Sequence, residues 1–122
     1  MTAWTDEELA AIAGASELSL APVRNDGTVQ NPRIVWVVRR EDDVYVRSVN
    51  GVEGAWFRGV RAHHAAHISA GGVEADVWFE DADHDLDEAI DEAYRRKYGR
   101  SSAVDHITAP KARATTLRIV RS

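Results

Sequence analysis

The chain has 122 residues, of which 44% are hydrophobic and 29% are charged, and its formal net charge is −5. These values are ordinary for a soluble globular protein of one domain, residues 1–122, and they exclude a disordered, collagen-like or coiled-coil body. The absence of cysteine excludes disulfides, thiol catalysis and thiolate metal sites. The negative charge argues against nucleic acid, and no apolar stretch is long enough to span a membrane, so we expect a cytoplasmic protein that binds neither.

The first predicted element is a short capped helix. The sequence Thr-Asp-Glu-Glu, which begins at Thr5, is a capping box in which the side chains of Thr5 and Glu8 each accept from the other residue's backbone N–H. Leu9 and Ile12 then form an apolar stripe at helical spacing, and Gly14 is a typical helix end. The pattern therefore predicts a helix that begins after Thr5 and ends at Gly14.

Strand patterns dominate the middle of the chain. Alternating apolar and polar residues predict a half-buried strand at residues 17–21, and Asn25-Asp26-Gly27 predicts a turn after it. A β-branched and aromatic run at 33–39 and an alternating run at 44–49 predict a hairpin. The remaining predicted elements are a short helix at 56–63, strands at 66–70 and 73–79 joined by Gly71-Gly72, a helix at 86–98 ended by Gly99, and a strand at 115–120.

The order of these elements predicts the fold class. Six short strands with hairpin turns and too few crossover helices for parallel βαβ units favour an α+β fold. We expect a small antiparallel β-barrel with its helices packed outside.

Basic and aromatic side chains gather in the strand-rich half of this acidic chain. Guanidinium groups bind phosphate oxygens two at a time, a serine hydroxyl adds a donor, and a tryptophan can stack on a planar ring. The alternative is that these arginines pair with surface carboxylates, which is the commoner use of surface arginine. The candidate ligand-binding residues are Arg24, Arg33, Arg47, Ser48, Trp56 and Arg58.

Two other clusters resemble metal sites. His63 and His67 are four residues apart, as metal ligands on one helix face would be, with His64 beside them. The alternative is a polar helix end, because no carboxylate lies between them and the helix pattern has already weakened. The acidic run at residues 80–87 resembles half a calcium loop but lacks its glycine, and negative charge at a helix start explains it more simply. We therefore expect no metal.

The order of motifs resembles the split-barrel flavin-binding proteins. The resemblance rests on Arg24-Asn-Asp-Gly27, on Pro32-Arg33 leading into a strand, and on the hairpin "DDVYVRSVNG" followed by "AWFRGVRAHHAAHISAGG". Residues 24–79 follow the plan of the deazaflavin-dependent nitroreductase group. With "EAYRRKYG" and "RATTLRIV" included, the whole chain is most similar to the uncharacterised family called domain of unknown function 2255.

This resemblance implies a split barrel and a place for a flavin-type cofactor. It would put the cofactor phosphate near Arg33, Arg47 and Ser48, and the ring system along residues 44–49 beside Trp56. Asn25-Asp26 stands where the nitroreductase group tends to have Lys-Ser, so FMN remains open beside a deazaflavin coenzyme.

Three functional hypotheses follow. The first is a flavin-type binding protein that acts as an oxidoreductase on a small molecule, in which the cofactor carries the chemistry and the protein orients it. The second is a non-enzymatic split-barrel module that binds a small-molecule ligand, or a cofactor-free dimer. The third is a hydrolase that uses His63 or His64 with nearby carboxylates.

We also expect a homodimer. Split barrels of this type form their ligand groove between two subunits, and so small a chain gains from burying more apolar area. The strand that carries Trp36 and the segment around Trp56 and Phe57 are the expected interface.

Overall fold

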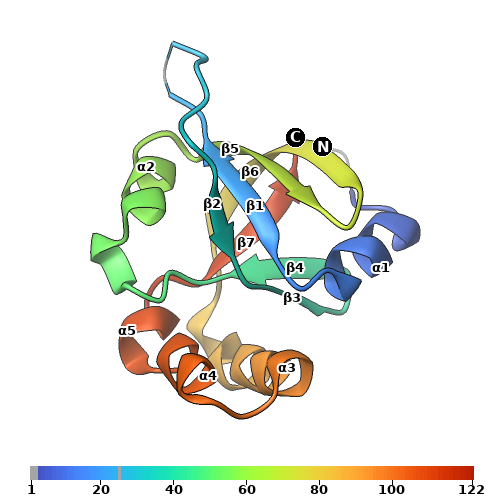
Figure 1. The fold of residues 1–122 in the computed structure, drawn as a ribbon, viewed down its shortest axis with the longest axis vertical. Helices are drawn as coiled ribbons and strands as arrows, with labels where there is room; N and C mark the ends of the chain where they lie inside the picture. The colour runs from blue at the N-terminus through green and yellow to red at the C-terminus, as the bar shows by residue number, and fades with distance from the viewer. Residues whose placement is uncertain (1–2, 25) are drawn as a thin grey trace.

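The computed structural model describes residues 3–24 and 26–122. Within them, the strands and helices follow one another in an order close to the predicted one (Figure 1). The strands are β1 (Leu18–Pro22), β2 (Arg33–Val35), β3 (Val37–Arg40), β4 (Asp43–Val46), β5 (Ala65–Ala70), β6 (Val73–Asp81) and β7 (Leu117–Arg121). The helices are α1 (Asp6–Gly14), α2 (Ala55–His63), α3 (Asp87–Tyr98), α4 (Ser102–Ile107) and α5 (Pro110–Arg113), with short 3₁₀ helices η1 (Gly51–Glu53) and η2 (His84–Leu86).

All pairings in the seven-stranded sheet are antiparallel, and the strands form a nearly closed barrel in the order β2-β1-β5-β6-β7-β4-β3. The two strands at the ends of this order, β2 and β3, are consecutive in the chain and are separated only by Trp36. The chain therefore leaves one edge of the sheet, bends at Trp36 and continues along the opposite edge. This confirms the predicted α+β barrel.

The barrel encloses the larger of two hydrophobic clusters. Alternate residues of β5 and β6 point inward, among them Ile68 and Phe79, because successive side chains of a strand face opposite sides of the sheet. Helices α1 and α2 cover the barrel with Leu9, Phe57 and neighbouring apolar residues, all of them buried. Burial of Phe57 in this cluster contradicts its predicted place in a dimer interface.

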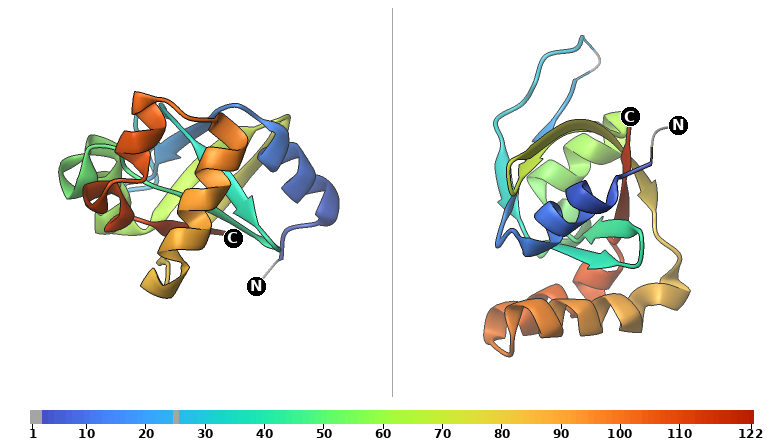
Figure 2. Two further views of the ribbon diagram at one scale, coloured as in Figure 1. Left: turned by 90° about the horizontal axis from the view of Figure 1, so that it is seen from below. Right: turned by 90° about the vertical axis from the view of Figure 1, so that its right-hand side faces the viewer.

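A layer of helices α3, α4 and α5 lies against one end of the barrel (Figure 2). The second hydrophobic cluster joins this layer to the β3–β4 hairpin and includes Val38, Tyr45, Ile90, Tyr94 and Ile107. The predicted helix at 86–98 corresponds to α3, whereas α4 and α5 lie in a segment for which no element was predicted. The layer places α4 beside the strand bend at Trp36.

Most predicted boundaries agree with the structure, and two differ in an informative way. The capping box at Thr5 and Glu8 is present, and β3 and β4 form the predicted hairpin. The prediction of a single strand at residues 33–39 is wrong, because this segment forms two strands, β2 and β3, that are separated by Trp36. The strand predicted at 44–49 ends at Val46, where the chain leaves the sheet. Of the predicted turn Asn25-Asp26-Gly27, Asn25 lies outside the described residues.

None of the helices in residues 3–24 and 26–122 is long and apolar enough to cross a bilayer.

Candidate functional site

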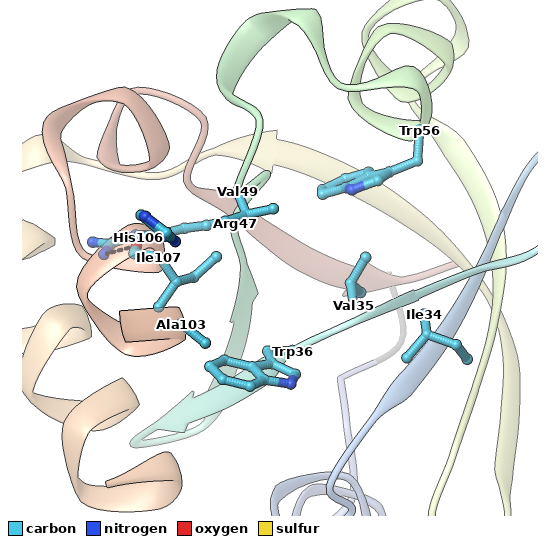
Figure 3. Close-up of a pocket in the computed structure, with 9 residues that line it drawn as sticks. All are labelled: Ile34, Val35, Trp36, Arg47, Val49, Trp56, Ala103, His106 and Ile107. Carbon is cyan, nitrogen blue, oxygen red and sulfur yellow. Dashed lines mark hydrogen bonds between the residues drawn. The ribbon is translucent and has the colours of Figure 1, made fainter. Parts of the chain in front are cut away.

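An apolar groove of about 260 Å³ opens where the strand bends (Figure 3). We call it the tryptophan groove, since Trp36 and Trp56 lie on opposite sides of it. Ile34 and Val49 also line it and remain 59% and 47% exposed, so two large apolar side chains face solvent at the rim of the groove. The full lining is Ile34, Val35, Trp36, Arg47, Val49, Trp56, Ala103, His106 and Ile107.

Trp36 is held firmly at the bend. Its ring stacks on that of Tyr98, with centroids 4.1 Å apart and planes 5° from parallel. The Tyr94 hydroxyl donates to the Trp36 carbonyl at 3.1 Å, which satisfies a backbone group that the break in the strand leaves without a ladder partner. Burial raises the pKa of Tyr94, so this hydroxyl stays protonated as a donor. The groove therefore has one rigid aromatic wall.

A polar pocket of about 200 Å³ adjoins the groove, and we call it the arginine pocket. Its cations are Arg24 and Arg33, both exposed, and the described residues form no ion pair with Arg33. Ala55, the first residue of α2, also lines it, and no side chain caps this helix start. Free N–H groups at a helix N-terminus favour an anion, as the two guanidinium groups do. The full lining is Pro22, Arg24, Gln30, Asn31, Arg33, Ala55 and Trp56.

The loop between β1 and β2 positions Arg24. The Arg24 N–H donates to the Thr28 carbonyl at 2.8 Å, and its side chain donates to the Thr28 hydroxyl at 3.4 Å. Thr28 in turn donates from its hydroxyl and its N–H to Asp26, at 2.7 and 2.9 Å. These two bonds lower the pKa of Asp26, so the carboxylate is charged and serves to order the loop.

Trp56 lines both cavities and therefore connects them. It lies in the first turn of α2, half-buried, with its ring edge-on to Phe57 at a centroid distance of 6.0 Å. A single wall thus separates an apolar groove from a cationic pocket. This arrangement suits an amphiphilic ligand with a planar apolar part and an anionic group.

Arg47 does not have the exposed position that we expected of it. The residue is 1% exposed, and each nitrogen of its guanidinium donates at least one hydrogen bond within the protein. It forms an ion pair with Asp91 and donates to Thr116 Oγ1 at 2.9 Å. Two backbone carbonyls, of Ile107 and Asp87, accept from it at 3.1 Å each. Arg47 therefore supports the floor of the groove, and four of its five N–H donors are already used within the protein.

Ser48 and Arg58 also lie apart from the arginine pocket. Ser48 is buried, and its backbone N–H donates to Thr115 Oγ1 at 2.8 Å. Arg58 is exposed on another face of α2, where it lines a separate hollow with Arg61. Of the six candidates, the structure brings Arg24, Arg33 and Trp56 together.

Sequence reasoning missed the contribution of α4. Ala103, His106 and Ile107 form one side of the groove, yet the six-residue helix that carries them is too short for a clear periodic pattern. Ser101 was the available signal, because its side chain accepts from the Val104 N–H as an N-cap does.

The three histidines near residue 64 do not share a helix face. His63 ends α2, His64 has a left-handed backbone and stacks on Trp78, and His67 lies on β5. His67 instead lies between Asp76 and Glu74, at 3.0 and 3.4 Å. Among the described residues, no group of three histidine, aspartate or glutamate side chains is arranged to hold a metal ion.

Solved structures with the same fold are split barrels. A protein described as an F420 reductase has a TM-score of 0.61 and 20% identity, with 92% of this chain and 90% of that chain covered. A putative pyridoxamine 5'-phosphate oxidase from Listeria innocua has a TM-score of 0.63 and 17% identity, with 96% and 90% covered. An FAD-binding protein from Mesorhizobium loti has a TM-score of 0.61 and 15% identity, with 99% and 92% covered. The barrel, its bend and its groove thus define a protein of the split-barrel class, whose known members include flavin-binding proteins.

Within that class, the chain belongs to the family described as "uncharacterized protein conserved in bacteria (DUF2255)", whose model matches residues 8–119. This confirms the family resemblance predicted from the sequence. Among curated proteins, none matches the chain.

Proposed function

We propose that the chain binds a flavin-type cofactor, FMN or a deazaflavin coenzyme, and uses it in an oxidoreductase reaction on a small molecule. The observation that carries this proposal is the shared wall at Trp56, with an apolar groove on one side and a cationic pocket on the other. The similarity to solved split barrels supports it, since one of them is described as FAD-binding and another as an F420 reductase.

The residues present fit such a cofactor. A flavin ring is planar and mostly apolar, which matches the tryptophan groove, and its side chain ends in phosphate, which matches Arg24, Arg33 and the start of α2. The groove and the adjoining pocket together reach the range of about 300–1,000 Å³ that is typical of cofactor sites. The bound ring would supply the hydride or electron transfer.

The chain's own residues would bind and orient the cofactor. Trp56 would pack against the ring, and the rigid stack of Trp36 on Tyr98 would limit its position on the other side. Helix α4 would cover one side of the groove with Ile107 and reduce contact with water. Arg47 would act indirectly, by fixing the groove floor to α3.

We further propose that the functional unit is a homodimer. Ile34 and Val49 are exposed apolar side chains at the groove, and Val52 is 60% exposed in η1. A second copy that packed on this surface would bury these side chains and close the open side of the groove. The interface would thus be formed by the groove rim, without Phe57.

Titration with FMN and with riboflavin, which lacks the phosphate, tests the cofactor proposal. We expect FMN to quench tryptophan fluorescence with a Kd in the micromolar range or tighter, and to bind more tightly than riboflavin. Arg33→Ala should weaken FMN binding about ten- to a hundredfold, the value of one charge-assisted contact, and should leave riboflavin binding unchanged.

Arg95→Ala is the matched control, because it removes an exposed arginine of α3 that lines neither cavity. The deazaflavin coenzyme is titrated in the same way. If folded protein binds none of the three ligands, the cofactor proposal is wrong, and a split-barrel module for another small ligand becomes the better account.

A further inference from the structure

A cavity of about 190 Å³ lies on another part of the molecule, and we call it the lysine pocket. Helices α1 and α3 lie on either side of the β3–β4 hairpin (Figure 1). The residues that line the pocket come from α1, β3 and α3. It shares no residue with the tryptophan groove or the arginine pocket. Its lining is Ala13, Val38, Arg39, Ala93, Arg96 and Lys97.

Three of these side chains are cations, and none of the described lining residues is acidic. The Arg39 Nε donates to the Glu41 carbonyl at 2.7 Å, which fixes the guanidinium at the end of the hairpin. No ion pair joins Arg39 or Lys97 to a carboxylate within residues 3–24 and 26–122. Arg96 has a distant partner, Glu92, at 3.7 Å on an exposed part of α3.

Lys97 is the least ordinary member of this set. Lys97 is half-buried, its Nζ lies over the Tyr98 ring at 5.1 Å from the centroid, and the Nζ donates to the Val37 carbonyl at 2.6 Å, which leaves two of its N–H donors for other acceptors. Burial lowers the pKa of Lys97 to about 8, and no carboxylate opposes this shift. A half-buried ammonium without a counter-charge is costly, and a bound anion would remove that cost.

Helix electrostatics explain only part of the arrangement. Arg95, Arg96 and Lys97 occupy the last turn of α3, where cations are favoured by the helix dipole. That effect does not require Lys97 to fold back onto β3, nor does it account for Arg39, which comes from a different element and faces the same cavity. The convergence of cations from two elements, in a chain of net charge −5, is what a site for an anion requires.

We propose that the lysine pocket binds a small oxoanion of the phosphate type, with Lys97, Arg39 and Arg96 as its ligands. The cavity is smaller than the roughly 300 Å³ at which sites for larger organic ligands begin, so the occupant is a free oxoanion or a very small phosphate ester. The site is independent of the proposed flavin site, and its occupant would link β3 to α3.

Inorganic phosphate is the probe, and the ε-carbon NMR signal of Lys97 is the local readout. We expect millimolar phosphate, at constant ionic strength, to shift this signal and to raise the pKa of Lys97 above about 8. Arg39→Gln should weaken phosphate binding about tenfold or more, and Arg95→Gln should leave it unchanged. Glycerol phosphate in place of phosphate distinguishes a small ester from the free anion.

Two further variants keep the result interpretable. Arg24→Ala/Arg33→Ala removes the cations of the arginine pocket, and the response of Lys97 to phosphate should persist in this double variant. The proposal for the lysine pocket can therefore hold even if the flavin proposal fails. Lys97→Gln, made in the same Arg24→Ala/Arg33→Ala background, should lose the stabilisation by phosphate that this background shows on thermal unfolding, and circular dichroism verifies that it is folded. A Lys97 signal that does not respond to phosphate, or equal affinity in Arg39→Gln and the wild type, would overturn the proposal.

Discussion

Arg47 and Asp91 form a buried ion pair that joins the barrel to its helical layer. Arg47 follows β4 and Asp91 lies in the middle of α3, and they are 1% and 0% exposed. The second oxygen of Asp91 accepts from Arg113 Nε at 2.8 Å, so this carboxylate binds two arginines at once. The groove floor, α3 and the segment before β7 are thus held by one buried carboxylate.

Asp91→Asn should therefore destabilise the protein strongly. Removing one partner of a buried pair leaves the other charge uncompensated, at a cost of about 3–5 kcal/mol. Chemical denaturation measures the change in the free energy of unfolding, with Glu92→Gln on the exposed side of α3 as the control, expected within about 0.5 kcal/mol of the wild type. A small effect of Asp91→Asn would show that Arg47 is neutralised by other groups.

Gly54→Ala should disturb the approach to α2 by steric crowding alone. A Cβ on Gly54 would lie 2.3 Å from Ser48 Oγ, while the backbone at Gly54, with φ of −59° and ψ of 135°, accepts any residue. We expect a loss of about 1–3 kcal/mol in the free energy of unfolding. Ser48→Ala should relieve most of it in the double variant, because Ser48 Cβ would be 3.6 Å away. Additive losses would contradict this contact.

His67 should titrate above its ordinary pKa of 6.5. Hydrogen bonds to Asp76 and then Glu74 raise the pKa of the imidazole. Because the folded pKa is raised, the stabilisation is full below about pH 6.5 and is lost as the pH rises through the folded value. His67 and Asp76 are both exposed, so their ion pair contributes at most about 1 kcal/mol to the free energy of unfolding. NMR titration of the ring protons measures the pKa, and Asp76→Asn should lower it more than Asp105→Asn does.

The dimer proposal predicts a change of mass with one substitution. Ile34→Lys places a charge on the groove rim, where the proposed interface would bury it, and should convert a dimer of twice 13.5 kDa into a monomer. Sedimentation at micromolar concentration measures this, with Val29→Lys as the control, since Val29 is 54% exposed away from the groove. A wild-type monomer, or an Ile34→Lys dimer, would contradict the proposed interface.

Local patterns predicted local structure well, and long-range contacts decided the rest. The capping box at Thr5 and the β3–β4 hairpin depend on neighbours in sequence, and both were found as predicted. The division at Trp36 depends on barrel closure, which no window of sequence contains. Burial of Arg47 has the same origin, because its partners Asp91 and Thr116 are 44 and 69 residues away. Of the predicted site residues, the structure brings together Arg24 of the β1–β2 loop, Arg33 at the start of β2 and Trp56 in the first turn of α2.

The bend at Trp36 has a consequence for how the barrel is closed. β2 is hydrogen-bonded only to β1 and β3 only to β4, so within the described residues no ladder joins the two ends of the strand order. A cut in the chain beside Trp36 would leave every strand pairing intact, and β2 and β3 would then have no covalent bond and no strand pairing between them. The ring of strands is therefore completed by covalent bonds through one tryptophan, in the wall of the groove itself.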